Sequence, residues 1–285
     1  MKQLLILSGK GGTGKTTVAG ALIELSKAKA LADCDVDAPN LHLITKMQGQ
    51  FATTPFYGMD KASIDQKRCI KCGACVDNCR FTAISDDYVV DPYACEGCGV
   101  CQLVCKYAAV TLKPFIAGKL MLYKKNKLFS TAELKMGSGN SGLLVDSVKK
   151  QLIKNSTDEK FAIIDGSPGI GCPVIASLNG ADMVLIVAEA SVSGVNDMKR
   201  IIKTARRFQI EIAVCINKYD VNDVETKKIE KFCTKENLLL AGKIPFDKKI
   251  VEAVNKGVSI VNIGDSKAGA AIYDLFNNIK TFFAV

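Results

Sequence analysis

Eight cysteines fall into two runs with the same spacing, C-x2-C-x2-C-x3-C, and the second run starts 26 residues after the first. The runs are Cys69, Cys72, Cys75 and Cys79, and Cys95, Cys98, Cys101 and Cys105. Thiolates at this spacing ligate 4Fe–4S clusters, which carry single electrons. Cysteine-rich spacings can also bind zinc, but the uninterrupted pattern favours iron. The spacing therefore predicts two redox centres.

The similarity between the two halves extends beyond the cysteines. Residues 69–84 and 95–110 align without gaps, and Gly73 matches Gly99. This repeat resembles the two-cluster bacterial ferredoxins, in which the fourth cysteine of each run ligates the other cluster. The resemblance implies one cluster on Cys69, Cys72, Cys75 and Cys105, and a second on Cys95, Cys98, Cys101 and Cys79.

The chain departs from the ferredoxin pattern at two positions. A proline usually follows the fourth cysteine, whereas Arg80 and Lys106 stand there in this sequence. A nearby cation favours the reduced, more negative cluster, since net charge helps to set the potential. We therefore expect at least one cluster to have a higher potential than in a proline-containing relative.

A glycine-rich loop follows the first predicted strand, residues 2–7. The sequence GKGGTGKT, residues 9–16, fits the phosphate-binding pattern G-x-x-x-x-G-K-[ST], and a helix is expected over residues 16–27. In such a loop backbone N–H groups converge on phosphate oxygens, Lys15 reaches the β- and γ-phosphates and Thr16 ligates Mg²⁺. The residues expected to bind the nucleotide are Gly9, Gly11, Gly12, Thr13, Gly14, Lys15, Thr16 and Thr17.

The run KGGTGKTT, residues 10–17, is similar to the deviant Walker A motif of the MinD/ParA superfamily. That superfamily also includes the nitrogenase iron protein and iron–sulfur carrier ATPases. The resemblance implies an ATPase that forms a homodimer through its nucleotide face, with Lys10 reaching across to the partner's nucleotide. The alternative is that Lys10 binds phosphate only in its own subunit.

Further segments carry the same resemblance. LADCDVDAPNL, residues 31–41, resembles the second strand and switch I, and IIDGSPGIG, residues 163–171, resembles the switch II region. The resemblance implies a Mg²⁺ shell formed by Thr16, Asp33, Asp35 and Asp165. It also implies that Asp35 acts near the attacking water, as a catalytic residue alongside Lys10 and Lys15.

The adenine site is implied in the same way by two later segments. Residues 212–220 resemble the strand that ends beside the base, and residues 241–261 resemble the closing segment. The resemblance implies that Asn217, Pro245 and Phe246 contact adenine. For Asn217, capping a loop is the alternative role.

These segments predict an α/β fold of the SIMIBI type of P-loop NTPase, with a mostly parallel sheet and helices on both faces. Strand–helix alternation breaks off between His42 and about Phe115, where the cysteine repeat lies. We expect a P-loop ATPase domain at residues 1–56 and 115–285, and an inserted small α+β two-cluster ferredoxin domain at residues 57–114. A unit of that size buries too little apolar surface to be stable alone, so we expect the clusters to stabilise its fold.

Composition limits the classes of partner. Of the 285 residues, 48% are hydrophobic and 24% charged, as in ordinary globular proteins. The net charge of +9 counts cysteines as neutral, and cluster-bound thiolates would lower it, so we expect no nucleic acid partner. No apolar run approaches the roughly 20 residues of a membrane span. We expect a cytoplasmic protein without a membrane partner, and a C-terminal helix, residues 268–283, that packs in the core.

The remaining cysteines and the single histidine are weaker signals. Cys34, Cys215 and Cys233 fit buried core positions, because free cysteine is among the most buried residue types. Cys172 follows switch II directly; we favour core packing for it, with a transient metal or cluster site at the dimer interface as the alternative. His42 fits a packed or partly exposed loop residue better than a catalytic base.

Two functions follow from these patterns. The favoured one is an ATP-driven dimer cycle that is coupled to electron transfer through two 4Fe–4S clusters, or to assembly and delivery of a metallocluster, with ATP and Mg²⁺ as further cofactors. The alternative is a MinD/ParA-like positioning or partition ATPase that uses the clusters as a redox sensor. The redox or cargo partner protein is not specified by the sequence.

Overall fold

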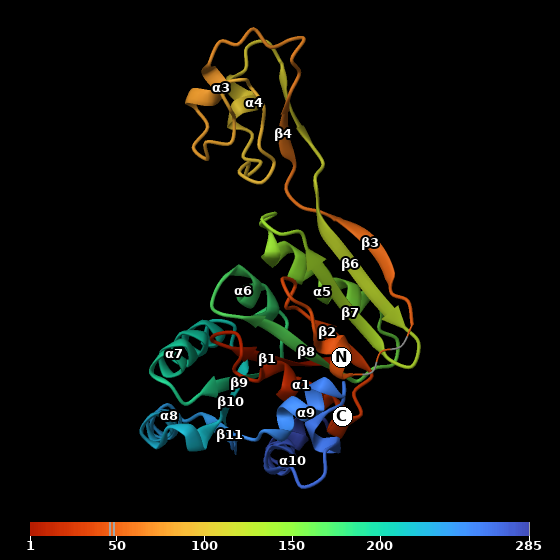
Figure 1. The fold of residues 1–285 in the computed structure, drawn as a ribbon, viewed down its shortest axis with the longest axis vertical. Coiled ribbons are helices and arrows are strands. Elements are labelled where there is room, and N and C mark those ends of the chain that lie inside the picture. Colours follow the sequence, from red (N-terminus) through yellow and green to blue (C-terminus); the bar gives the residue numbers. More distant parts are fainter. Residues whose placement is uncertain (46, 48, 285) are drawn as a thin grey trace. The chain divides into compact units, whose positions relative to one another are not determined.

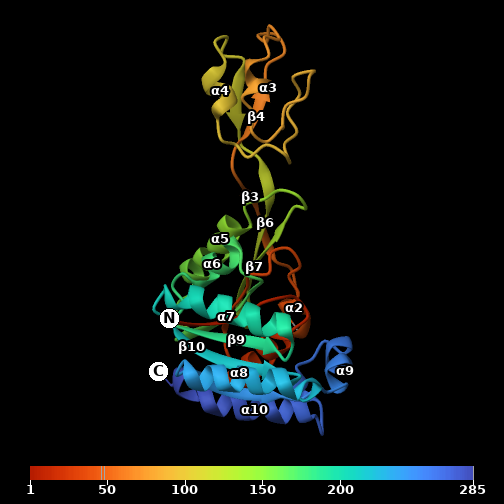
Figure 2. The same cartoon turned by 90° about the vertical axis from the view of Figure 1, so that its left-hand side faces the viewer.

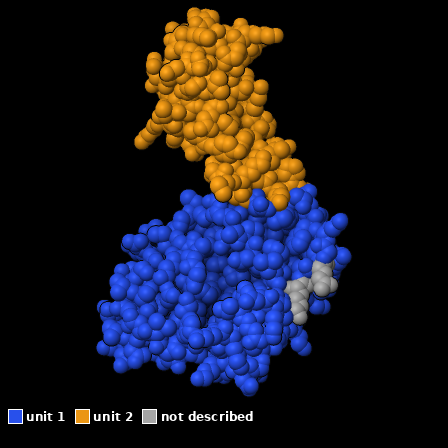
Figure 3. Space-filling view, in the orientation of Figure 1, with its two compact units in different colours: residues 1–53, 120–133, 141–285 blue, residues 54–119, 134–140 orange. Residues whose placement is uncertain are grey.

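The computed structural model describes residues 1–45, 47 and 49–284. The chain divides into two compact units, which are coloured separately in Figure 3. Unit 1 comprises residues 1–53, 120–133 and 141–285, and unit 2 comprises residues 54–119 and 134–140. Unit 2 therefore contains the whole segment 57–114 in which the sequence analysis placed the inserted domain, with a few flanking residues and one separate stretch.

Unit 1 is built on a mostly parallel sheet, because its central strands are continuous apolar runs. Leu4, Leu5, Ile6 and Leu7 are all 0% exposed, as expected for a strand that is covered on both faces. The strand order is β11-β10-β9-β1-β8-β2-β7-β6-β3, and the pairs from β11 to β7 are parallel. The strands are β1 Lys2–Ser8, β2 Ala30–Asp33, β3 Ala52–Tyr57, β6 Ile116–Lys124, β7 Leu128–Leu134, β8 Phe161–Pro168, β9 Met183–Glu189, β10 Glu211–Asn217 and β11 Leu239–Ile244.

Helices cover both faces of this sheet (Figures 1 and 2). On one face α1 contacts β8 and α10 contacts β11, and on the other face α5, α6 and α7 contact β2, β8 and β9. The helices of unit 1 are α1 Lys15–Ser26, α2 Leu41–Ile44, α5 Ser141–Asn155, α6 Cys172–Leu178, α7 Val192–Arg206, α8 Asp223–Lys235, α9 Lys249–Asn255 and α10 Lys267–Ile279, with 3-10 turns Tyr219–Val221, Ile260–Asn262 and Lys280–Phe282.

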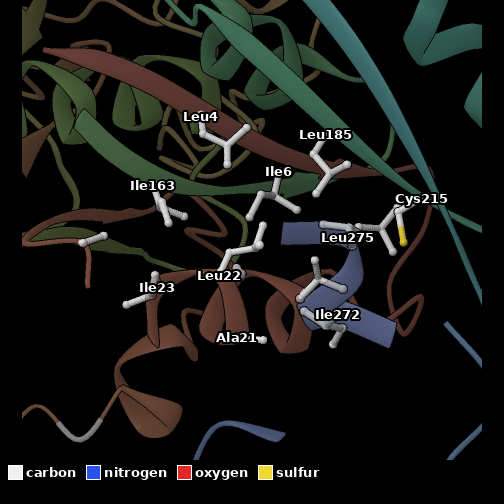
Figure 4. Close-up of a cluster of buried hydrophobic side chains, with 14 of the residues drawn as sticks. Leu4, Ile6, Ala21, Leu22, Ile23, Ile163, Leu185, Cys215, Ile272 and Leu275 are labelled. Atoms are coloured by element: carbon white, nitrogen blue, oxygen red, sulfur yellow. The ribbon is translucent and has the colours of Figure 1, made fainter. Parts of the chain in front are cut away.

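One core cluster lies between the sheet and helices α1 and α10. Figure 4 shows Leu4 and Ile6 of β1 facing Leu22 of α1, with Ile272 and Leu275 of α10 close by. All five side chains are 0% exposed. The expectation that the C-terminal helix packs in the core is thus confirmed. Among the described residues, no helix is long and apolar enough to cross a membrane.

Three strands of the large sheet have places in it that the sequence analysis did not give. Strand β3 lies between His42 and Phe115, where the strand–helix alternation breaks off, whereas β6 and β7 follow in the segment 115–285 that was assigned to the ATPase domain. Only residues 125–127 separate β6 from β7, so these neighbouring strands form a hairpin. The pairing of β7 with β2 joins this hairpin to the parallel strands.

Unit 2 repeats one backbone pattern twice. Its antiparallel strands are β4 Lys61–Ile64 and β5 Val110–Lys113, and its short helices are α3 Ala74–Asp77 and α4 Val100–Val104. Positive φ angles recur at the offset of 26 residues, at Lys71 and Gly97, at Gly73 and Gly99, and at Thr82 and Ala108. The two cysteine runs therefore share a conformation as well as a spacing.

Candidate functional site: the nucleotide cleft and the cysteine cavities

The phosphate loop connects β1 to α1 and contains glycines at positions where a side chain would be strained or would clash. Gly12 and Gly14 have φ angles of 77° and 92°, in the region that glycine adopts without strain. A Cβ on Gly14 would lie 2.3 Å from Asn217 Nδ2. Gly9 lies against α7 instead, because a Cβ there would be 2.2 Å from Asp197 Cβ.

The loop borders a cleft of about 470 Å³. Most of the predicted nucleotide-binding residues line it, namely Gly11, Gly12, Thr13, Gly14, Lys15, Thr16, Thr17, Asn217 and Phe246, together with Asp35. Gly9, Lys10 and Pro245 do not belong to this lining. The cleft therefore combines a phosphate-binding loop with the segments that the resemblance assigned to Mg²⁺ and to the base.

The P-loop lysine makes a buried ion pair at the base of the cleft. Lys15 Nζ lies 2.5 Å from Asp165 Oδ1, and their side chains are 6% and 0% exposed. Burial opposes the charge of Lys15, but attraction to Asp165 outweighs burial, so the pKa of Lys15 is raised. The other oxygen of Asp165, Oδ2, is buried without a hydrogen bond among the described residues. An unpaired carboxylate oxygen beside the phosphate site suits Mg²⁺ or its water ligands.

Asp33 fixes the backbone of the predicted switch I. Its carboxylate accepts hydrogen bonds from the backbone N–H groups of Asp35, Asn40 and Leu41 at 3.0, 2.9 and 2.9 Å. Burial and the neighbouring Asp165 raise the pKa of Asp33 to about 7. Burial also raises the pKa of Asp35. Asp33 thus acts on switch I through its hydrogen bonds, whereas Asp35 is the aspartate that lines the cleft.

The signature lysine lies in a small charged network in its own subunit. Lys10 Nζ is 2.6 Å from Glu189 Oε2, and Lys218 Nζ is 3.1 Å from Glu189 Oε1. The hydrogen bond from Lys10 lowers the pKa of Glu189. Lys10 remains 39% exposed. Sequence reasoning missed Glu189, although a carboxylate that ends a buried parallel strand is a signal that could have identified it.

Asn217 braces the phosphate loop. Its Nδ2 donates to the Thr13 carbonyl at 2.6 Å, and its Oδ1 accepts from the Lys218 N–H at 3.0 Å. The Phe246 N–H donates to Asp220 Oδ1 at 2.8 Å, while the Phe246 ring is 52% exposed. The amide of Asn217 is therefore occupied by the loop, and Phe246 is the exposed ring in the cleft that suits stacking on a base.

The eight repeat cysteines of unit 2 line two separate cavities of similar volume. One cavity, of about 20 Å³, is bordered by Cys79, Cys95, Cys98 and Cys101. The other, also of about 20 Å³, is bordered by Cys69, Cys72, Cys75 and Cys105. Each cavity receives three sulfurs from one run and the fourth from the other run.

Backbone N–H groups are directed at the exchanged sulfurs. Ala83 N–H donates to Cys79 Sγ and Ala109 N–H donates to Cys105 Sγ, both at 3.4 Å. Against the effect of burial, such N–H groups lower the pKa of Cys105. Among residues 1–45, 47 and 49–284, no three His, Cys, Asp or Glu side chains meet as they would around a single metal ion.

Comparison with known proteins places the nucleotide cleft in a family. Residues 4–260 match the family described as the CobQ/CobB/MinD/ParA nucleotide binding domain. The chain belongs to this family. An uncharacterized protein of Methanocaldococcus jannaschii, MJ0578, is 31% identical over 285 residues, covering 98% of this chain and 97% of that protein. This member of the CobQ/CobB/MinD/ParA family is therefore a P-loop ATPase with the α/β fold that its relatives share.

Two further relatives carry more specific descriptions. An iron-sulfur cluster carrier protein of Pyrococcus abyssi is 25% identical over 295 residues, covering 96% of this chain and 83% of that protein. The structure of the septum site-determining protein MinD of Pyrococcus horikoshii, complexed with Mg-ADP, has a TM-score of 0.60 at 19% identity. The match covers 98% of this chain and 95% of that one. The second likeness shows the shared fold.

The other cysteines of this ATPase have two different environments. Cys34, Cys215 and Cys233 are buried as predicted, and burial raises the pKa of Cys34 to about 12 and that of Cys233 to about 11. Cys172 is exposed, so the favoured prediction of core packing for it was wrong. It is the first residue of α6, and the beginning of that helix lies at the surface even though Val174 and Leu178 are buried.

His42 is packed and partly exposed, as predicted, but it lies on helix α2 and not in a loop. Its ring packs edge-on against Phe51, with 6.1 Å between the ring centroids, and burial lowers its pKa.

Proposed function

We propose that this ATPase uses an ATP-driven homodimer cycle to control electron transfer through two 4Fe–4S clusters held by unit 2. The observation that carries the proposal is the occurrence, in one chain, of a P-loop cleft and two cavities that are each bordered by four cysteines. In this proposal residues 57–114 are an inserted ferredoxin domain within the ATPase domain.

The donor sets support clusters rather than zinc. A zinc ion draws four ligand atoms to about 2.3 Å from one point, and the described cysteines do not meet in that way. A cube needs sulfurs spread around a cavity, as the two sets of four are. Bound there, the clusters would supply single-electron transfer. The N–H groups of Ala83 and Ala109 would stabilise the thiolate charge.

The contacts of the ATPase residues support a cycle in which Lys15 and Lys10 exchange their ion-pair partners when nucleotide binds. Phosphate and Mg²⁺ would compete with Asp165 for Lys15, since the P-loop lysine binds the β- and γ-phosphates. The Asp33 carboxylate accepts hydrogen bonds from backbone N–H groups of switch I, and so connects this segment to the proposed Mg²⁺ site. Nucleotide binding would therefore alter switch I, and dimerisation through the nucleotide face would bring Lys10 to the partner's phosphates.

Delivery of a metallocluster is a second candidate with its own support. The P. abyssi relative is described as a cluster carrier, and Cys172 is an exposed thiol at the end of the switch II segment. Substituting Cys172→Ala separates the two candidates. Lost cluster transfer with intact electron transfer would support delivery, and no effect on either would support the electron-transfer cycle.

The positioning alternative makes a different prediction. A partition or septum-type ATPase would bind DNA or liposomes in the presence of MgATP with a marked dependence on salt. Binding of this kind, together with an unchanged rate of electron transfer on addition of ATP, would favour that alternative.

The proposal is tested by anaerobic purification, iron analysis and EPR with and without MgATP. We expect eight irons per chain, no zinc, and cluster signals that change when MgATP is added. Fewer than eight irons after complete reconstitution, or retained zinc, would refute the two-cluster assignment. If eight irons are present but the EPR signals and electron-transfer rates do not change with MgATP, the coupling is refuted.

A further inference from the structure

We propose that Lys61 raises the reduction potential of the cluster held by Cys79, Cys95, Cys98 and Cys101 above that of the second cluster. This inference rests on the proposed two-cluster assignment and adds to it a direction for the electron. The more readily reduced centre would be the one beside Lys61.

Lys61 is a buried lysine next to residues that line one of the two cavities. It begins β4, its residue is 6% exposed, and its Nζ donates a hydrogen bond to the Cys95 carbonyl. The next residue, Ala62, borders the cavity that Cys95 borders. The Phe115 ring lies 5.7 Å from Nζ and helps to shield the ammonium from water.

Among the described residues, no direct ion pair neutralises the charge of Lys61. In the described part of the chain, no carboxylate forms an ion pair with its Nζ, and its hydrogen-bond acceptor is a neutral carbonyl. A buried charge acts at longer range than an exposed one, because solvent and salt screen exposed charges.

The pseudo-symmetric half has no equivalent cation. At the offset of 26 residues, Lys61 corresponds to Asp87, which is exposed and of opposite charge. Arg80 and Lys106, the cations that the sequence placed next to the clusters, are both exposed. Among the described residues, Lys61 is therefore a buried cation beside one cavity and not the other. Glu96 borders the same cavity, where its counterpart in the other half is Ile70, and it acts in the opposite direction, but Glu96 is exposed and solvent screens its charge more strongly.

The direction of the effect follows from charge balance. One-electron reduction takes a 4Fe–4S core from 2+ to 1+, so the ligated cluster gains one negative charge. A fixed cation beside that cluster stabilises the reduced form and raises the midpoint potential. The electron comes from the reductant that the titration supplies, and no proton or bond change at Lys61 is needed.

The test is an EPR-monitored redox titration of the full chain, with matched lysine variants. Lys61→Met removes the buried charge. Lys113→Met removes an exposed charge from the residue directly opposite in the β4–β5 register, and so serves as the control. The signal of each cluster is assigned with Cys98→Ser, which perturbs only the cluster near Lys61.

We expect Lys61→Met to reduce the equilibrium constant for reduction of that cluster about tenfold, a shift of about 59 mV for one electron. The second cluster should change less than about threefold by the same scale, and Lys113→Met should leave both within that limit. Equal shifts in both clusters, no shift, or the same shift with Lys113→Met would overturn the proposal.

The unsubstituted protein provides an independent check, because Lys61→Met also removes a hydrogen bond to Cys95. In the wild-type chain the signal altered by Cys98→Ser must belong to the cluster with the higher potential. If that cluster has the lower or an equal potential, the proposal fails even when the variant does not fold. Iron content separates this result from failure of the two-cluster assignment, since eight irons per chain must be present first.

Discussion

Three buried lysines, Lys15, Lys61 and Lys149, are 5–6% exposed and satisfy their charges in different ways. Lys15 pairs with Asp165, which raises its pKa against burial. Lys61 has a carbonyl as its acceptor. Lys149, on α5, donates to the carbonyls of Ser177 and Asn179 at the end of α6. These contacts fix α5 against α6, and within the described ranges no carboxylate lies at hydrogen-bond distance from Lys149.

Lys149 therefore predicts a pH dependence of stability. Burial lowers its pKa to about 8, whereas an unfolded lysine has a pKa of about 10.4. Between these values the unfolded chain binds more protons than the native one, so the free energy of unfolding rises with pH. The rise should be roughly 3 kcal/mol between about pH 8 and about pH 10.5.

Urea unfolding of the wild-type protein and Lys149→Met across this range measures the effect as a difference. Lys149→Met should lack the rise, and should also be less stable at pH 8 by about 1–3 kcal/mol because two carbonyls lose their donor. The control is Lys150→Met, since Lys150 is 75% exposed. A rise that persists in Lys149→Met would contradict the assignment.

At the scale of elements, the short helices of unit 2 depend on glycines with positive φ. Gly99 begins α4 with a φ of 78°, and Gly97 has a φ of 67°. A Cβ on Gly97 would lie 2.2 Å from the Asp60 carbonyl oxygen, whereas a Cβ on Gly99 has no neighbour closer than 3.8 Å. The two glycines therefore share a backbone conformation, but only Gly99 has room for a Cβ atom.

Alanine substitution should separate the effect of the positive φ angle from the effect of the close approach to the Asp60 carbonyl. Gly99→Ala should cost about 1 kcal/mol for the left-handed conformation and keep eight irons. Gly97→Ala must also displace backbone, so iron should be lost from the set Cys79, Cys95, Cys98 and Cys101. Iron analysis and the rate of bleaching by a chelator measure this. Equal iron retention in the two variants would show that the close approach to Asp60 has no structural role.

At the scale of the whole molecule, the proposed dimer cycle would require Lys10 to leave Glu189. Lys10 Nζ is bound to Glu189 in its own subunit, and an exposed ion pair of this kind is worth at most about 1 kcal/mol. The pair can therefore open when a partner's phosphates become available. The ion pair with Glu189 would hold Lys10 near the nucleotide face until a partner subunit binds.

We expect Lys10→Ala to reduce ATP turnover by roughly 10³-fold, the lower end of the range for a cation supplied in trans, and to abolish the ATP-dependent dimer in sedimentation. Glu189→Gln should increase the dimer fraction, because it frees Lys10. Lys231→Ala, an exposed lysine of α8, is the control. Full activity of monomeric Lys10→Ala would refute a role for Lys10 in turnover. Reduced turnover with an intact ATP-dependent dimer would support the alternative that Lys10 acts in its own subunit.

The sequence by itself determined the features that depend on short spacings. The P-loop, the two cysteine runs and the apolar central strands such as residues 4–7 are local, because each needs only neighbouring residues to define its conformation or chemistry. The family and the parallel sheet could be predicted from them. The buried positions of Cys34, Cys215 and Cys233 followed from their place in apolar elements.

Only the tertiary structure decided what depends on contacts between distant segments. The positions of β3 and β6 in the sheet, the ion pair of Lys10 with Glu189 and the burial of Lys61 against Cys95 all join residues far apart in the chain. Cys172 shows the same limit, since its helix is partly buried but its own position faces solvent. Composition and periodicity report how apolar a segment is, whereas the burial of a single charge is set by the segment that packs over it.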